Sequence, residues 1–386
     1  MLRQIYESKR QEVFGLLVDH WLHENEGFGI YKKGFDYMGQ FDALMQIEYS
    51  TFPIVMQCVL AGNLPIVYRE RGTQGDELRR ALGAHQQRST SPTQPFIYAN
   101  YLVDVKGCSP TYQYLATVTE DLAKYLKDPD FAVQVDNVVF EDAQRGEPKY
   151  ISIDSATLVT ALNKSRSAFR NRMKYDIAHL GYAKRAPIPP PLSQWGFTSK
   201  APKRERSHGR HEKSNWLMNL VESLCQMRLG KKHAMTVFVV YCIPFPELSA
   251  IAETFFSVIG QACVDNDGGF SCYPAGLSIN SATKLTEEEK PDNAVWMLEH
   301  VPWRSNQEEL LRPLKERNEA AKAEMKAVEI ERLAMDDAIK TRMESCEGIA
   351  REFNAWLPAP NYREDVKQRL ADIDTAIKAL KAHVPE

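Results

Sequence analysis

From Asn306 onwards the sequence follows a helical pattern to its end, and this feature limits the possible fold more than any other. In the last stretch, apolar residues recur at alternating steps of four and three: Val366, Leu370, Ile373, Ile377, Leu380 and Val384. The preceding stretch carries a less regular stripe: Leu314, Ala321, Met325, Val328, Met335 and Ile339. Pro358 and Pro360 lie between the two stretches. The pattern predicts an antiparallel helical hairpin over residues 302–386.

The remaining sequence predicts an α+β (mixed α/β), multi-domain fold ahead of this hairpin. The chain has 386 residues, 44% of them hydrophobic and 26% charged. A chain of this length usually folds into more than one domain, each with its own hydrophobic core. The composition is that of a globular protein. We expect an α+β domain over 1–154, a basic segment over 155–186, a proline-rich basic linker over 187–213, an α/β domain over 214–301 and the hairpin over 302–386.

In the N-terminal part, helical and strand patterns alternate. Helices are predicted over 3–25, from Thr51 and Pro53 to Gly62, and from the capping-box spacing at Thr117 to Lys127. Strands are predicted over 64–68, 96–105, 133–141 and 150–153, and a polar loop over 84–94. This mixture gives the N-terminal domain its α+β assignment.

In the second half, five prolines between Pro187 and Pro202 predict a linker that cannot bury enough apolar surface to order itself. Helices are then predicted over 215–229 and 248–263, and strands over 235–243 and 270–279. A strand, a crossover helix and another strand would form a βαβ or ferredoxin-like half.

Charge is distributed unevenly along the chain. The formal net charge is only −3. Between Lys164 and Lys213, however, thirteen Lys and Arg residues face three acids, so this stretch carries +10 and the remainder −13. Such local asymmetry indicates a polyanionic partner.

Residues 154–182 resemble a helix-turn-helix. A short first helix would bury Leu158, the turn would fall at Asn163–Lys164, and Ser165 would cap a second helix whose inner face carries Phe169, Met173, Ile177 and Leu180. The resemblance implies that the second helix enters the major groove with Arg166, Ser167 and Arg170 near base edges, and that a strand begins at Tyr182, as in winged relatives. The alternative is an ordinary helical pair whose cations form a solvated face.

We therefore predict nucleic-acid binding, DNA or RNA, through the basic centre. The candidate contact residues are Lys164, Arg166, Ser167, Arg170, Arg172, Lys174, Lys184, Arg185, Lys200, Lys203, Arg204, Arg206, Arg210 and Lys213. The last six would form a flexible arm, or else a solubilising linker. Trp195 and Phe197 would either stack on bases or pin the linker to a domain.

No motif predicts a metal, a cofactor or a catalytic residue. His20, His23 and Glu24 have the wrong order for a zinc helix, His208 and His211 lack cysteine partners, and the loop from Asp265 to Gly269 lacks the final glutamate of a calcium loop. The sequence also lacks the phosphate-loop, dinucleotide and nucleophile-elbow signatures.

Three hypotheses for the whole protein follow. The first is a non-enzymatic nucleic-acid-binding component of a bacterial or phage-type replication, regulation or defence system. The second is an assembly subunit that binds a protein partner, or a second copy of itself, through residues 306–386. The third is an enzyme of unfamiliar type using Asp265, Asp267 and Ser278.

The sequence also predicts a cytoplasmic protein without a membrane segment. Its start lacks the apolar run of a signal peptide, and no apolar span reaches 18 residues. Seven widely spaced cysteines without a C-x-x-C pair indicate buried thiols in a reducing compartment.

Overall fold

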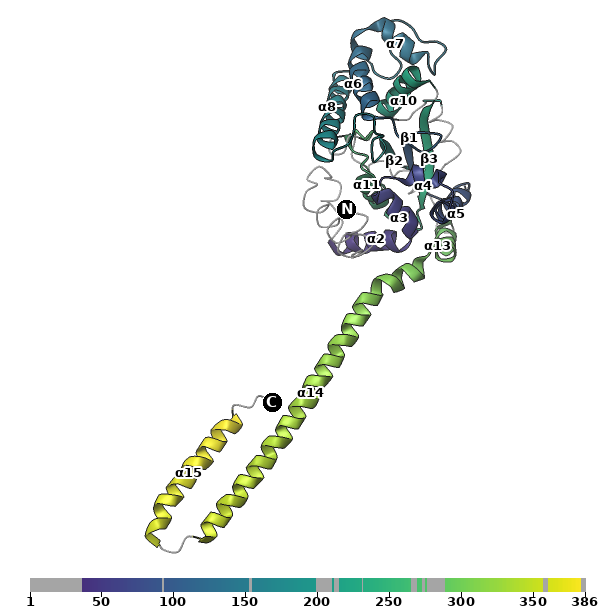
Figure 1. Ribbon diagram of the computed structural model, residues 1–386. Helices are drawn as coiled ribbons and strands as arrows, with labels where there is room; N and C mark the ends of the chain where they lie inside the picture. Colours follow the sequence, from purple (N-terminus) through teal and green to yellow (C-terminus); the bar gives the residue numbers. More distant parts are fainter. Residues whose placement is uncertain are drawn as a thin grey trace. The chain divides into compact units, whose positions relative to one another are not determined.

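The structure, a computed structural model, describes residues 37–91, 94–152, 155–198, 210–211, 215–230, 232–264, 269–272, 275, 289–356 and 360–382. The chain divides into two compact units, one ending at Leu310 and the other starting at Leu311. The α+β class and the C-terminal helical hairpin are as predicted (Figure 1). The helix predicted over 3–25 lies outside the described residues.

The first unit is built mainly of helices around one small sheet. Its helices are α2 (Tyr37–Tyr49), α3 (Pro53–Leu60), α4 (Leu64–Arg69), α5 (Thr73–Arg88), α6 (Tyr112–Lys127), α7 (Pro129–Asp136), α8 (Ala156–His179), α10 (Trp216–Leu229), the short η2 (Pro246–Leu248), α11 (Ser249–Ile259) and α13 (Glu289–His300). The long helix α14 (Trp303–Trp356) begins in this unit and continues into the second, which also contains α15 (Pro360–Ala382).

The sheet has three antiparallel strands in the order β2-β1-β3. They are β1 (Phe96–Asp104), β2 (Ser193–Thr198) and β3 (His233–Cys242). Phe96 pairs with Thr198 on one side and with Cys242 on the other, and the β1–β3 register shifts at a bulge between Ile97 and Tyr98. The central strand β1 is buried along almost its whole length. The sheet therefore joins chain segments predicted to belong to the N-terminal domain, the linker and the second α/β domain.

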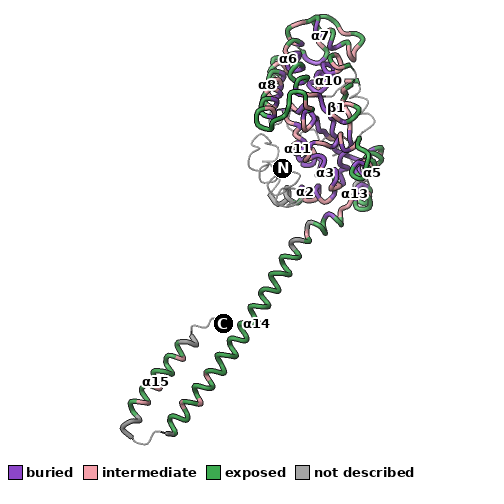
Figure 2. The backbone as a smooth tube through the Cα atoms, in the orientation of Figure 1, coloured by how far each residue is buried: buried purple, intermediate pink, exposed green. Residues whose placement is uncertain are grey.

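Two hydrophobic cores pack around this sheet. One contains residues of α2, α3, α4, α5, α11 and α13 together with most of the sheet. The other contains residues of α6, α7, α8 and α10 and includes Leu102 from β1. Figure 2 shows these buried segments in purple within the first unit. The elements that carry the basic segment thus belong to the second core.

Two predicted strands are helices in the structure. Residues 64–68 lie in α4, where Pro65 occupies the first turn and so needs no backbone hydrogen-bond donor. Residues 133–136 lie in α7, whose N-cap Asp128 accepts hydrogen bonds from the amides of Asp130 and Phe131. These start signals outweigh the β-branched residues that suggested strands.

Three further predictions need correction. Residues 150–152 form no strand, although the ring of Tyr150 is buried in the second core. The polar loop predicted from residue 84 begins later, because α5 continues to Arg88. Helix α6 starts at Tyr112, five residues before the predicted cap, because Thr111 provides the N-cap.

The strongest local patterns are confirmed. Helix α10 is capped by Asn215, whose side chain accepts hydrogen bonds from the amides of Leu217 and Met218. Strands β1 and β3 begin and end within two residues of the predicted strands. Helix α11 lies inside the helix predicted over 248–263. Most of the strand predicted over 270–279 lies outside the described residues.

The linker prediction is wrong for Ser193–Thr198, which forms β2. Trp195 is 2% exposed and stacks on Phe256 with ring centroids 5.6 Å apart. Phe197 is half-buried and pairs with Ile97. The prolines did not prevent a strand here because none of them lies within it, and the strand gains its stability from pairing with β1. Trp195 is consequently a core residue and cannot serve as a platform for bases.

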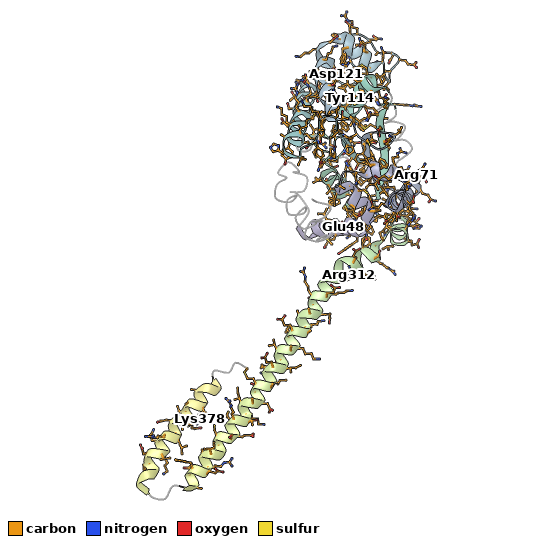
Figure 3. All side chains as sticks on the ribbon, viewed as in Figure 1. Glu48, Arg71, Tyr114, Asp121, Arg312 and Lys378 are labelled. Carbon is orange, nitrogen blue, oxygen red and sulfur yellow. The ribbon has the colours of Figure 1, made fainter. Side chains whose placement is uncertain are left out.

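Helices α14 and α15 leave most of their side chains exposed. Figure 2 shows both helices almost wholly green, and Figure 3 shows side chains such as Arg312 and Lys378 standing out from them. Val366, Leu370 and Ile377 of α15 are only half-buried. At the start of α14, Asn306 is buried, and its amide donates to the carbonyls of Tyr49 and Thr51, both at 2.9 Å. This end of α14 is thus fixed to the first unit, whereas the apolar stripes farther along remain open.

Candidate functional site

The predicted helix-turn-helix is a single helix. α8 runs without interruption from Ala156 to His179, so the proposed turn at Asn163–Lys164 lies inside it. Ser165 is not a cap, because its hydroxyl donates to the carbonyl of Ala161 within the helix. Neither Asn163 nor Lys164 breaks a helix, and the buried residues Leu162, Phe169 and Met173 form one continuous inner face. The outgoing strand expected at Tyr182 is also not observed.

Two of the predicted DNA-reading arginines bind the protein itself. Arg166 donates through Nε to the carbonyl of Thr119 at 3.0 Å. Arg170 forms an ion pair with Glu120, which it also hydrogen-bonds, and this bond lowers the pKa of the Glu120 carboxyl. Both partners belong to α6, so these arginines attach α8 to its neighbouring helix.

Arg172 is also a structural residue. Its guanidinium lies 3.6 Å from the carboxylate of Asp176, with both side chains 9% exposed, and it donates to the carbonyl of Pro190. Tyr112 donates its hydroxyl to the same carboxylate at 2.9 Å. Burial, followed by the bond to Asp176, raises the pKa of the Tyr112 hydroxyl. The arrangement connects α8, α6 and the chain ahead of β2.

A smaller set of cations is open to solvent. Lys174, near the end of α8, and Lys184 and Arg185, just after it, are exposed and form no ion pair with a carboxylate in the described part of the chain. The amide of Gln113 donates to the carbonyl of Lys184 at 2.9 Å, which holds this loop against the start of α6. We call Lys174, Lys184 and Arg185 the basic edge.

The other predicted contact residues are dispersed. Lys164 and Ser167 are exposed on α8, and the Ser167 hydroxyl donates to the carbonyl of Asn163. Arg210 is exposed on a separate turn. The remaining five lie outside the described residues: Lys200, Lys203, Arg204, Arg206 and Lys213. The structure thus brings together only part of the predicted site.

Beside Arg210, sequence reasoning missed a buried polar network. His211 Nδ1 lies 2.7 Å from the hydroxyl of Tyr150, and His211 Nε2 lies 3.1 Å from a carboxylate oxygen of Glu222. The Tyr150 hydroxyl is also 2.6 Å from Ser223 Oγ, and burial raises its pKa. The second oxygen of Glu222 accepts from the amide of Met235 at 2.8 Å. Since these groups hydrogen-bond one another, the network anchors the turn at 210–211.

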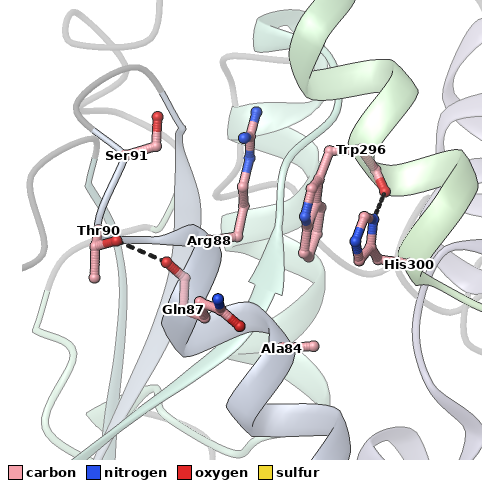
Figure 4. A pocket seen from close by; sticks show the side chains of 7 residues that line it. All are labelled: Ala84, Gln87, Arg88, Thr90, Ser91, Trp296 and His300. Carbon is pink, nitrogen blue, oxygen red and sulfur yellow. Dashed lines mark hydrogen bonds between the residues drawn. The ribbon is translucent and has the colours of Figure 1, made fainter.

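A pocket of about 380 Å³ lies between α5 and α13 (Figure 4). Its lining residues are Ala84, Gln87, Arg88, Thr90, Ser91, Trp296 and His300. The guanidinium of Arg88 lies 5.6 Å from the centroid of the Trp296 ring, and His300 stacks on that ring at 4.8 Å. Arg88 also donates to Asn293 at 2.8 Å. These contacts use the aromatic and cationic groups to connect the two helices.

Neither a metal centre nor a membrane segment emerges from the described residues. They contain no group of three His, Cys, Asp or Glu side chains placed to hold a metal ion. Among the helices they form, none combines the length and apolarity needed to cross a membrane. His20, His23, His208, Asp265, Asp267 and Ser278 fall outside the described part of the chain. No family model, curated protein or solved structure matches this chain.

Within the described part of the chain, nine exposed large hydrophobic residues lie on the C-terminal helices. The exposed large hydrophobic residues there are Met325, Val328, Ile330, Leu333, Met335, Ile339, Ile349 and Phe353 on α14 and Ile373 on α15. Met325 is 74% exposed and Ile349 64%. Of these positions, the sequence pattern predicts Met325, Val328, Met335 and Ile339 on α14 and Ile373 on α15 as part of the hairpin seam, but in the single chain they face solvent.

Proposed function

We propose that this protein is an assembly subunit that binds a helical partner through α14. The supporting observation is the exposed stripe of α14, which we define as Ala321, Met325, Val328, Met335 and Ile339. Single exposed apolar residues are common, but contiguous apolar surfaces mark sites of protein interaction.

The energetics of an isolated helix support this proposal. A long helix in water gains most of its stability by burying an apolar face against another element. Along α14 the intrahelical ion pairs, such as Lys322 with Glu319 and Arg332 with Glu329, are exposed. Solvent screens such exposed pairs, so they add little to the stability of the helix. A partner helix on the stripe would provide the missing stabilisation.

Photo-crosslinking inside cells tests the proposal on the intact chain. Benzoylphenylalanine would replace Met335, which is on the stripe, or Asp337, which is exposed on the opposite face of the same helix. We expect a discrete cross-linked product from position 335 and little from position 337. Equal yields at the two positions, or none at either, would exclude the stripe as a binding surface.

The second candidate function is nucleic-acid binding through the phosphate backbone. The basic edge supports it, because Lys174, Lys184 and Arg185 are exposed and close along the chain. With α8 continuous and Arg166 and Arg170 bound to α6, we propose backbone contact without base reading.

For either function we propose a cytoplasmic location. None of the seven cysteines forms a disulfide in the structure, and Cys346 is exposed. A reducing compartment keeps such thiols from oxidising. Fractionation of cells that express the tagged full chain tests this location, and recovery outside the cytosol would contradict it.

A further inference from the structure

We infer that the helical partner of α14 is a second copy of this chain, bound antiparallel. The inference rests on the proposed assembly function and specifies its partner. Its basis is the charge pattern on both sides of the exposed stripe, considered together with the part of α14 that α15 leaves uncovered.

The chain's own second helix covers only part of α14. With a rise of about 1.5 Å per residue, the 54 residues of α14 span about 81 Å and the 23 residues of α15 about 35 Å. Running antiparallel to α14 from the level of Trp356, α15 therefore reaches about residue 334. Residues 311–333 lie beyond it. Where α15 does run alongside, the half-buried residues of α14 are Met343, Gly348 and Ala350, which are not on the stripe.

The stripe has the repeat of a coiled coil. Met325, Arg332 and Ile339 fall at one core position of the heptad, a, and Ala321, Val328 and Met335 fall at the other, d. When two copies run antiparallel about a point between residues 326 and 327, Met325 of one lies opposite Val328 of the other. In the same register Arg332 lies opposite the small Ala321, which leaves room for its alkyl stem to pack while its charge reaches water.

The flanking charges favour this antiparallel register. At successive e positions the chain carries Lys315, Lys322, Glu329 and Asp336, all exposed. In the register above, Lys322 faces Glu329 of the second copy and Lys315 faces Asp336. Two-fold symmetry repeats each contact, so four opposite-charge pairs form. One like-charge contact, Glu324 with Glu331, also occurs twice, which leaves the attraction in excess.

A parallel pairing in register would be repelled. Parallel coiled coils bring a g residue beside the e residue of the next heptad in the partner helix. Arg317 would then face Lys322, Glu324 would face Glu329, and Glu331 would face Asp336. All three contacts join like charges, and symmetry doubles each. The same residues that attract in the antiparallel arrangement thus disfavour the parallel one.

Charge reversal in the full-length chain tests both the partner and its direction. Sedimentation equilibrium would compare the wild type with Lys322→Glu, Glu329→Lys and the double variant. We expect a dimer that each single change weakens roughly tenfold, because each removes two attractive contacts and creates two repulsive ones. The double variant should regain wild-type affinity, since it exchanges the charges of each pair. Lys326→Glu, off the stripe, is the matched control and should leave the dimer unchanged.

Three results would overturn the inference. If the chain is monomeric at every concentration, the partner is not a second copy. If the single changes strengthen the dimer, the helices are parallel. If the dimer ignores all the changes, another surface holds it. The crosslinking at Met335 separates these results from failure of the assembly function. A cross-linked product with a different protein would support the assembly function and would contradict a second copy as the partner.

Discussion

Arg228 and Asp121 form a two-pronged ion pair that joins α10 to α6. Arg228 Nε lies 2.7 Å from one carboxylate oxygen of Asp121, and Nη2 lies 2.6 Å from the other. The carboxylate, labelled in Figure 3, is 7% exposed and the guanidinium 42%. Only arginine has the planar fork that reaches both oxygens at once, so this pair fixes the direction of the two side chains.

Replacing Arg228 with lysine should therefore destabilise the first unit. The lysine side chain would keep the charge but lose one of the two hydrogen bonds to a largely buried acceptor. We expect the free energy of unfolding to fall by about 1–2 kcal/mol, measured by urea denaturation. Arg145→Lys is the matched control, because its pair with Asp130 is exposed on both sides. A loss at Arg145 as large as that at Arg228 would contradict the role of burial.

The buried imidazole of His85 should make stability depend on pH. Its side chain lies in the first core between the rings of Phe52 and Trp296, and burial lowers its pKa to about 3. The unfolded chain takes up this proton near pH 6.5 and the folded chain only near pH 3. The contribution of neutral His85 to the free energy of unfolding is thus fully present above about pH 6.5. It declines by up to about 1.4 kcal/mol per pH unit as the pH falls from about 6.5 to about 3.

The His85→Phe variant should remove this part of the pH dependence while retaining an aromatic ring in the core. Urea unfolding at several pH values between about 4.5 and 7.5 would measure the slope for the variant and the wild type. His179→Phe serves as the control, because His179 is exposed at the end of α8. An unchanged slope in His85→Phe would show that other groups cause the acid sensitivity.

Sequence reasoning succeeded where the signals that define an element are local. The cap at Asn215, the β-branched run in β3 and the regular apolar spacing of the C-terminal helices each lie within the element they define. β2 could not be found this way. Its six residues follow a proline-rich stretch, and their burial depends on pairing with β1, almost a hundred residues earlier.

The candidate site shows the same division between local and distant information. The excess of cations over 164–213 can be counted in the sequence, but which of them remain free depends on groups elsewhere in the chain. Glu120, fifty residues before Arg170, forms an ion pair with it. The carbonyl of Thr119 accepts a hydrogen bond from Arg166. The turn predicted at Asn163–Lys164 does not form, because neither residue breaks a helix and α8 continues through both.

Gly107 should tolerate no side chain. Its φ is +84°, and a Cβ atom would collide with the backbone of Pro65. Gly146 has nearly the same φ, +85°, but open space around it. We expect Gly107→Ala to lower the free energy of unfolding by about 2–4 kcal/mol and Gly146→Ala by about 1 kcal/mol, because only the first adds a clash to the backbone strain. Thermal unfolding of both variants measures the difference, and equal losses would refute the close approach.

Reversing the charge of the basic edge should weaken phosphate binding without unfolding the protein. Changing Lys174, Lys184 and Arg185 together to glutamate removes three exposed cations that form no ion pair with described carboxylates. In an anisotropy titration with a labelled DNA duplex at about 50 and about 200 mM salt, we expect weaker binding and a salt slope smaller by between two and three, about 0.9 per lost phosphate contact.

The matched control carries the same charge change on other exposed cations of the first unit: Arg80, Lys106 and Lys127, each changed to glutamate. Since both triple variants alter the net charge equally, only a localised interface separates them. Binding lost equally in both would indicate a general effect of net charge. If the wild type does not bind the duplex, the proposed nucleic-acid function is wrong. The assembly function through α14 is tested separately, by the crosslinking at Met335.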